Sequence, residues 1–131
     1  MRDRPLSPHL SVYKMTRYSL LSSFSNRVTG CGLSVGLLVL VLWLTAIARG
    51  PLAYQRASSW LSMPILKVLY ALLLIAFVYH LVAGIRHLVW DTGHGLERGQ
   101  SRRSAWLVLA ATVVLVLALG YFLANPHTAA R

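Results

Sequence analysis

Acidic residues are almost absent from this chain of 131 residues. Only Asp3, Asp91 and Glu97 carry a carboxylate, against 13 lysines and arginines. None of the three lies inside a long apolar run, which disfavours a carboxylate-lined transport path through a membrane. Cysteine is equally scarce, because Cys31 is the only one in the sequence. A single cysteine excludes a disulfide within this sequence and a cysteine-ligated iron–sulfur cluster.

Long polar stretches are missing too, so there is no room for a sizeable soluble domain. Hydrophobic residues make up 56% of the sequence and charged residues 12%, which is typical of an integral membrane protein. Three apolar runs, at about 28–47, 65–89 and 104–124, reach the roughly 20 residues that a membrane helix needs. We therefore expect an all-α fold: one membrane-anchor domain, residues 1–131, with three transmembrane helices.

The basic residues flank these runs and do not form one basic face, which argues against nucleic-acid binding despite a formal charge of +10. One group lies beside the N-terminus and the second loop: Arg2, Arg4, Lys14, Arg17, Arg27, Arg86, Arg98, Arg102 and Arg103. The smaller group lies on the other side: Arg49, Arg56, Lys67 and Arg131. The positive-inside rule then predicts a cytoplasmic N-terminus and an extracytoplasmic C-terminus in a bacterial-type inner membrane. The same cations suit anionic membrane lipid.

The segments outside the runs are expected to be irregular. Pro5 and Pro8 predict a non-helical segment from residue 1 to about residue 21, and its long basic start does not resemble a cleavable signal peptide. An extracytoplasmic loop is expected from Gly50-Pro51 to Pro64, and a second loop from Asp91 to Arg103.

The first span opens with polar residues that contact with lipid alone does not require. At 3.6 residues per turn, Ser23, Arg27 and Gly30 share one face of a helix. An adjoining face carries three more polar residues: Ser22, Asn26 and Thr29. Ser23 is also a plausible helix N-cap, and Arg27 an anchor for lipid phosphate. This face can therefore form part of a binding site, or it can serve only to cap the helix and anchor it to lipid.

Two other features of the spans concern packing. Gly32 and Gly36 have the small-xxx-small spacing that lets another helix approach closely, although glycine is common in membrane helices. The third run carries no ionisable residue, so we assign it packing and no chemistry.

His80 lies in the middle of the otherwise apolar second run. Burying an imidazole at that depth in a membrane costs free energy. Such a residue usually serves as a ligand, a proton carrier or an interhelical polar link. Gly84 follows one turn later on the same face and removes a side chain beside the imidazole. A porphyrin lying against the helix needs such a flat space, which favours a haem ligand over a simple hydrogen bond.

Cationic side chains follow His80 towards the cytoplasmic end. His87 lies on nearly the same face, about 10 Å closer to the surface. Arg86 and His87, with Arg27 of the first span, have the charge that haem propionates need, although long basic side chains also snorkel towards the membrane surface. Asp91 is placed either to hydrogen-bond His87 or to end the helix.

Two axial ligands approach a haem iron from opposite faces of the ring, so His80 and His87 on one helix cannot both bind the same haem. The other histidines lie outside the apolar runs: His9, His94 and His127. A six-coordinate haem would therefore take its second ligand from another chain. We accordingly expect the three helices to form part of a heteromeric helix bundle.

Three strings of residues resemble the cytochrome b membrane-anchor subunits of succinate dehydrogenase (respiratory complex II), the larger of its two anchor polypeptides. The strings are Arg4-Pro5-Leu6-Ser7-Pro8-His9-Leu10 with Tyr13, Ser23-Phe24-Ser25-Asn26-Arg27-Val28-Thr29-Gly30, and His80, Gly84-Ile85-Arg86-His87 and Asp91. Their order and spacing fit, so the resemblance covers essentially the whole chain.

The resemblance implies that His80 is one axial ligand of haem b and that the smaller anchor subunit supplies the other. It also implies that Ser23 and Arg27 help to form the ubiquinone pocket. Iron–sulfur and flavoprotein subunits would dock on the cytoplasmic face, where the flavoprotein oxidises succinate in the tricarboxylic acid cycle. The chain itself would then carry electron transfer and quinone binding without oxidising succinate.

One position departs from the family, which usually has a histidine where this chain has Asn26. That histidine is associated with a haem propionate. Asparagine donates a hydrogen bond but carries no charge, so we expect a small change in haem potential with the haem retained. Two alternatives remain: an anchor of a fumarate reductase, or a non-redox scaffold in which His80 is an interhelical polar link.

Overall fold

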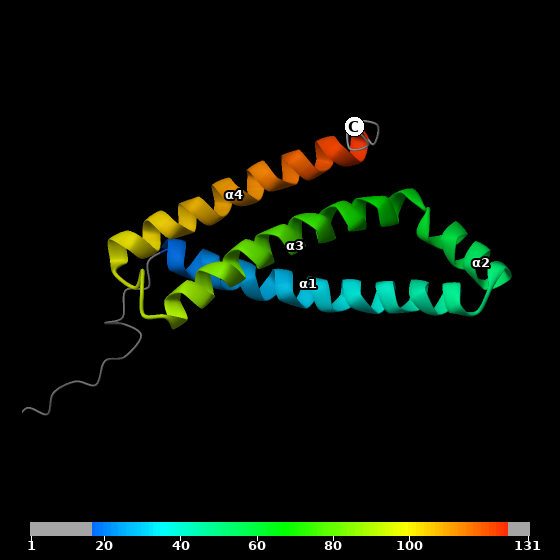
Figure 1. The fold of residues 1–131 in the computed structure, drawn as a ribbon, viewed down its shortest axis with the longest axis horizontal. Helices are drawn as coiled ribbons and strands as arrows, with labels where there is room; N and C mark the ends of the chain where they lie inside the picture. Colours follow the sequence, from blue (N-terminus) through cyan, green and yellow to red (C-terminus); the bar gives the residue numbers. More distant parts are fainter. Residues whose placement is uncertain (1–16, 126–131) are drawn as a thin grey trace, which may run out of the picture.

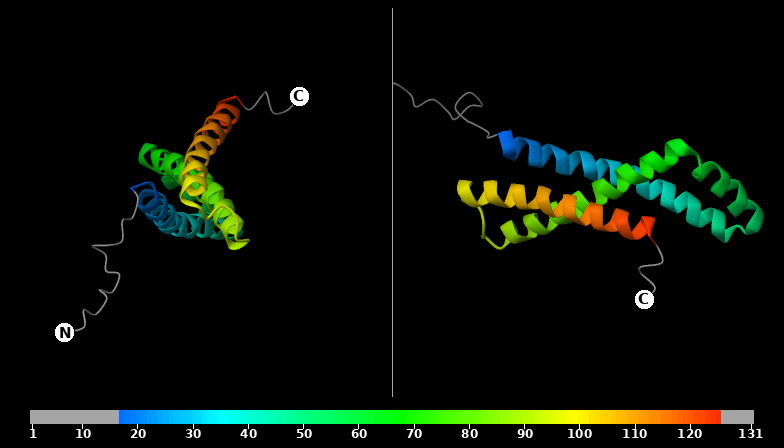
Figure 2. Two further views of the ribbon diagram at one scale, coloured as in Figure 1. Left: turned by 90° about the vertical axis from the view of Figure 1, so that its left-hand side faces the viewer. Right: turned by 90° about the horizontal axis from the view of Figure 1, so that it is seen from above.

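The computed structural model describes residues 17–125, which form four helices. They are α1 (Arg17–Ala48), α2 (Pro51–Leu61), α3 (Pro64–Asp91) and α4 (Arg98–Ala124). α1 and α3 run antiparallel, the short α2 joins them at one end, and α4 packs against α3 (Figure 1). The three long helices cross at an angle instead of running parallel (Figure 2). The described part contains no strand, which confirms the expected all-α fold.

Three of these helices are long and apolar enough to cross a membrane. The candidate spans are Leu20–Ala48, Pro64–Asp91 and Arg98–Ala124, with mean hydropathies of 2.4, 2.4 and 2.6. Most of their large apolar side chains point outwards; Leu42, for example, is 70% exposed. Exposed apolar area costs about 25 cal/mol per Å² in water, so these faces require lipid or other protein helices around them.

The helices extend further than the sequence analysis expected. α1 begins at Arg17, so residues 17–21 are helical and not irregular. α4 begins at Arg98, which leaves only residues 92–97 as the second loop. The expected irregular segment before residue 17 and the tail after residue 125, with His9 and His127, lie outside the described residues.

The expected extracytoplasmic loop is largely helical, because α2 occupies Pro51–Leu61. Its local sequence explains the result. Gly50 takes a φ of 99°, a turn conformation that favours glycine. Pro51 then lies in the first helical turn, where its missing N–H costs no hydrogen bond. The prolines and glycine were correctly taken as the ends of the spans, but they also begin a short helix.

Close packing of α1 on α3 depends on Gly36. A Cβ atom on Gly36 would lie 3.1 Å from both Cδ atoms of Leu73, whereas one on Gly32 would meet nothing within 4 Å. Of the two glycines with small-xxx-small spacing, only Gly36 is therefore at a close approach within this chain. α3 packs against α4 through a small core formed by Tyr79, Ala83 and Val108.

Replacing Gly36 by valine should push α1 away from α3, since the added side chain overlaps Leu73. We expect a loss of about 1–3 kcal/mol of stability, measured as a lower thermal midpoint of the purified protein in detergent. Gly32→Val is the matched control, because it has the same chemistry in the same helix but meets open space. Equal losses from the two variants would contradict this packing.

Candidate functional site

His80 points from α3 towards α1 and is held there through Nδ1. This nitrogen lies 3.2 Å from the backbone carbonyl oxygen of Asn26 and 3.3 Å from Oγ1 of Thr29. A carbonyl oxygen only accepts, so the contact with Asn26 puts the proton on Nδ1. Thr29 can accept as well, because its hydroxyl donates to the carbonyl oxygen of Ser25 at 2.8 Å. Nε2 consequently keeps a lone pair for another partner.

Gly30 gives His80 the room to lie against α1. A Cβ atom at Gly30 would be 3.1 Å from Cε1 of the imidazole and 3.9 Å from Nε2. Any other residue would therefore press on the ring. The sequence analysis placed Gly30 on the face of Ser23 and Arg27 but had no means of linking it to His80, because that contact joins two helices.

A groove of about 530 Å³ runs between α1 and α3 beside His80. Gly30, Ser34 and Gly36 of α1 line one wall. Phe77 and His80 of α3 line the other. Apart from the imidazole and one hydroxyl, the wall is apolar. A groove of this kind suits a flat apolar ligand held by a single nitrogen.

Gly84 and His87 follow on the His80 side of α3. Among residues 17–125, no atom lies within 4 Å of where a Cβ of Gly84 would stand, so the space predicted beside His80 is open in this part of the chain. His87 is half-buried, and its Nδ1 donates to the carbonyl oxygen of Ala83 at 2.7 Å. Asp91 is the exposed last residue of α3 and makes no hydrogen bond to His87 in the described structure. Its helix-end interpretation therefore fits the structure.

Ser23 and Arg27 lie exposed near the start of α1. Within residues 17–125, neither side chain makes a hydrogen bond or an ion pair. Arg27 is seven residues before Ser34, so the two share a side of the helix. Since Ser34 lines the groove, Arg27 stands on the groove side of α1, beyond the groove's end.

Arg86 lies on a different side of α3, about 120° around the helix from His80. It is only 6% exposed, and its guanidinium lies at the junction of three helices. Nε donates to Ser104 Oγ at 2.9 Å, Nη1 to Ser22 Oγ at 2.8 Å, and Nη2 to the carbonyl oxygen of Ser101 at 3.1 Å. Its charged end also stacks over the ring of Trp90, 4.0 Å from the centroid. The structure thus gives Arg86 three serine partners from α1 and α4.

These serine partners were not predicted from the sequence. Ser101 fell in the expected second loop, and Ser104 opened a run to which packing alone was assigned. Ser22 was placed on a polar face, but nothing showed what that face meets. The sequence indicated only that an arginine within an apolar span needs polar partners from other helices, without identifying which residues they are.

The two oxygens of Asn26 differ in their hydrogen bonding. Its backbone oxygen accepts from His80, while its side-chain Oδ1 is buried and has no hydrogen-bond partner among the described residues. Buried polar atoms are normally paired, so a donor from outside this part of the chain would be favourable here.

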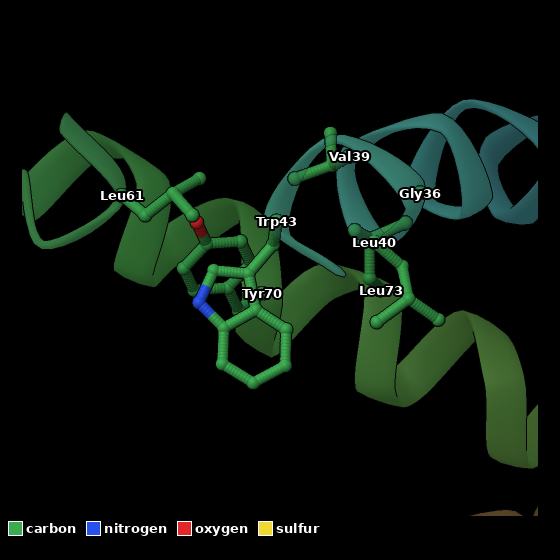
Figure 3. A pocket seen from close by; sticks show the side chains of 7 residues that line it. All are labelled: Gly36, Val39, Leu40, Trp43, Leu61, Tyr70 and Leu73. Carbon is green, nitrogen blue, oxygen red and sulfur yellow. The ribbon is translucent and has the colours of Figure 1, made fainter. Parts of the chain in front are cut away.

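A second hollow, of about 310 Å³, lies at the far end of the helices between α1, α2 and α3. Trp43 of α1, Leu61 of α2 and Tyr70 of α3 converge on it (Figure 3). Its lining holds no charged side chain and no histidine. It therefore offers an apolar packing surface and no metal ligand, and the chemistry of the chain concentrates around His80.

Comparisons with known proteins find relatives along most of the chain. The model of the family described as succinate dehydrogenase/fumarate reductase transmembrane subunit matches residues 1–119. The succinate dehydrogenase cytochrome b556 subunit of Paracoccus denitrificans is 39% identical over 119 residues, covering 88% of each chain. That of Rickettsia felis is 34% identical over 116 residues, covering 88% of this chain and 90% of the relative. The cytochrome b560 subunit of Reclinomonas americana is 34% identical over 122 residues, covering 88% and 83%.

Proposed function

The chain belongs to the family of succinate dehydrogenase and fumarate reductase transmembrane subunits, and from this premise we propose that it binds haem b between itself and a second anchor subunit. The observation that carries the proposal is the arrangement of His80. Nδ1 is fixed on the backbone of α1, Nε2 keeps a lone pair, and a groove lies beside the ring. Ligating histidines commonly have this arrangement, in which the other ring nitrogen donates to a backbone carbonyl.

The donor set of the chain fits a haem better than a bare metal ion. Within residues 17–125, no group of three or more His, Cys, Asp or Glu side chains could hold a metal. A porphyrin supplies four ligands to its iron, so the protein needs to add only one on each face. His80 would be one of these, with Gly84 leaving space for the ring, and the second anchor subunit would supply the other. Bound there, the haem would supply one-electron chemistry.

Three cationic side chains are proposed for the haem propionates: Arg27, Arg86 and His87. Arg27 and His87 carry most of this proposal, because they lie on the groove side of α1 and on the His80 side of α3. Arg86 lies on another side and already donates to serines, so its contact with a propionate would require rearrangement.

Ser23 and Arg27 are proposed to bind the ubiquinone headgroup. A quinone carbonyl gains negative charge as it is reduced, so hydrogen-bond donors and a fixed cation stabilise it. Ser23 offers a hydroxyl and Arg27 a guanidinium one turn apart, and neither is engaged within the described chain. This pairing favours a quinone over lipid phosphate, which would need the cation alone.

The proposed assembly follows from the distribution of charge. The basic residues around the start of α1 and the loop between α3 and α4 favour a cytoplasmic location for that end, in a bacterial-type inner membrane. Iron–sulfur and flavoprotein subunits would dock there and deliver electrons from succinate. The described relatives are succinate dehydrogenase subunits by name, which favours this direction over fumarate reduction.

Replacing His80 by alanine should remove the haem. In the purified complex, we expect the b-type band of the reduced-minus-oxidised spectrum to disappear, because alanine has no ligand for iron. The unsubstituted complex should show that band although Asn26 replaces the usual histidine. A chain that carries no haem in either form would instead support the scaffold interpretation, with His80 as an interhelical link.

Gly30→Ala tests whether the haem depends on the seat of the His80 imidazole. The added methyl group presses on Cε1, so we expect a shifted haem band or midpoint potential in the spectrum of the purified complex. Gly32→Ala should leave both unchanged, because its methyl group meets nothing within 4 Å. Identical spectra for the two variants would show that the imidazole is seated elsewhere.

Arg27→Leu should reduce ubiquinone reductase activity by about a hundredfold, since it removes a cation from the developing negative charge. Succinate oxidation by an artificial dye should stay unchanged, because the soluble subunits perform it. Arg49→Leu, at the opposite end of α1, is the matched control. Unchanged quinone reduction in the Arg27 variant would exclude this role.

A further inference from the structure

Arg86 is a buried cation with no carboxylate partner in the described structure. Three of its partners are serines, and the fourth is the face of the Trp90 ring. Its charge is therefore balanced by hydroxyl and carbonyl dipoles and by the aromatic ring. Trp90 in turn donates to the carbonyl oxygen of Gly95 at 3.1 Å, which ties the loop between α3 and α4 to the same cluster.

This cluster lies where the start of α1, the end of α3 and the start of α4 meet (Figure 1). From Leu20 onwards, the first turns of α1 have few other contacts there with the described residues. Leu20, Leu21 and Phe24 are 52%, 63% and 62% exposed, so apolar packing does little to fix this part of the helix. Besides Arg86, a long hydrogen bond of 3.3 Å joins Tyr79 Oη to the backbone oxygen of Ser22.

The bond between Arg86 and Ser22 helps to fix the rotation of the first turns of α1, ahead of the contact between Asn26 and His80. Neighbouring residues of a helix are about 100° apart, so the position of Ser22 against Arg86 also fixes the direction of the exposed Ser23. Arg27 then lies about 40° beyond Ser23, on the groove side of α1. If α1 lost its bond to Arg86, its first turns could rotate, and both side chains would change direction together.

We propose that Arg86 is a positioning residue for the quinone site, which acts through Ser22 to aim Ser23 and Arg27. This inference rests on the proposed quinone role of those two residues. Arg86 does not touch the quinone in this account; it holds the helix that does. The arginine fork suits this task, because it donates to α1 and α4 at the same time, whereas a lysine has a single charged nitrogen.

Two serine variants separate positioning from general stabilisation. Ser22→Ala removes the bond of Arg86 to α1, and Ser104→Ala removes a bond of similar length to α4. In the purified complex, we expect Ser22→Ala to raise the KM for ubiquinone about three- to tenfold, because misplaced binding groups weaken the site. Ser104→Ala should change it less than twofold. Haem content and succinate oxidation by a dye should stay unchanged in both.

Further variants test whether Arg86 acts through Ser22. Ser22→Thr keeps the hydroxyl and should restore the KM of the unsubstituted complex. Arg86→Gln should raise the KM at least as much as Ser22→Ala, and combining the two should add nothing, since both break the same bond. Arg86→Lys serves the same comparison if the glutamine variant fails to assemble.

The results distinguish failure of the positioning role from failure of the proposed quinone site. A KM that Ser22→Ala leaves within twofold, or that Ser104→Ala raises equally, would overturn the positioning role. Additive effects of the Arg86 and Ser22 variants would do the same. If Arg27→Leu impairs quinone reduction while Ser22→Ala does not, only this inference fails. If Arg27→Leu has no effect either, the proposed quinone site itself fails.

Discussion

A polar side chain inside an apolar helix has to find its partners in protein, because the membrane interior offers none. Two such side chains of α3, His80 and Arg86, lie about 120° apart and reach the neighbouring helices, and the packing of the helices depends on how each is accommodated. The imidazole of His80 rests on the backbone of α1 beside Gly30. The guanidinium of Arg86 lies among the serines of α1 and α4. These contacts bring both neighbouring helices to α3.

The two side chains are satisfied to different degrees. Each of the three nitrogens of the Arg86 guanidinium donates a hydrogen bond within the chain, and these bonds join α1, α3 and α4 at one end of the bundle. His80 uses Nδ1 alone, which orients the ring and leaves the nitrogen suited to iron. Arg86 thus joins three helices, whereas the second ring nitrogen of His80 stays open for the proposed ligand. On the same helix, Arg86 therefore serves helix packing, and His80 is the residue proposed to bind a ligand.

The sequence predicted the position and polar residues of each span better than the contacts between the spans. Hydropathy was sufficient to find three spans. The depth of His80 in the second span singled it out as a candidate ligand, and that role stays a prediction. α2 was not predicted, since Gly50 and Pro51 indicate an ending as readily as a new helix. The partners of Arg86 were not predictable because they come from two other helices and are ordinary serines. Periodicity within one helix carries no information on such contacts.

The different roles of Arg86 and His80 on α3 also explain why one chain is not enough for the proposed function. The contacts that fix α1 and α4 are made within the chain, so the partners need not build its fold. What the chain presents outwards is one imidazole lone pair, the groove beside it, and the exposed pair Ser23 and Arg27. Each is half of an interaction: a haem bound at His80 would need a second ligand from another chain, and a quinone would need a source of electrons in order to be reduced. In the proposed function, a second anchor subunit and soluble redox subunits would supply what these groups require, and the serine cluster around Arg86 would keep Ser23 and Arg27 in position.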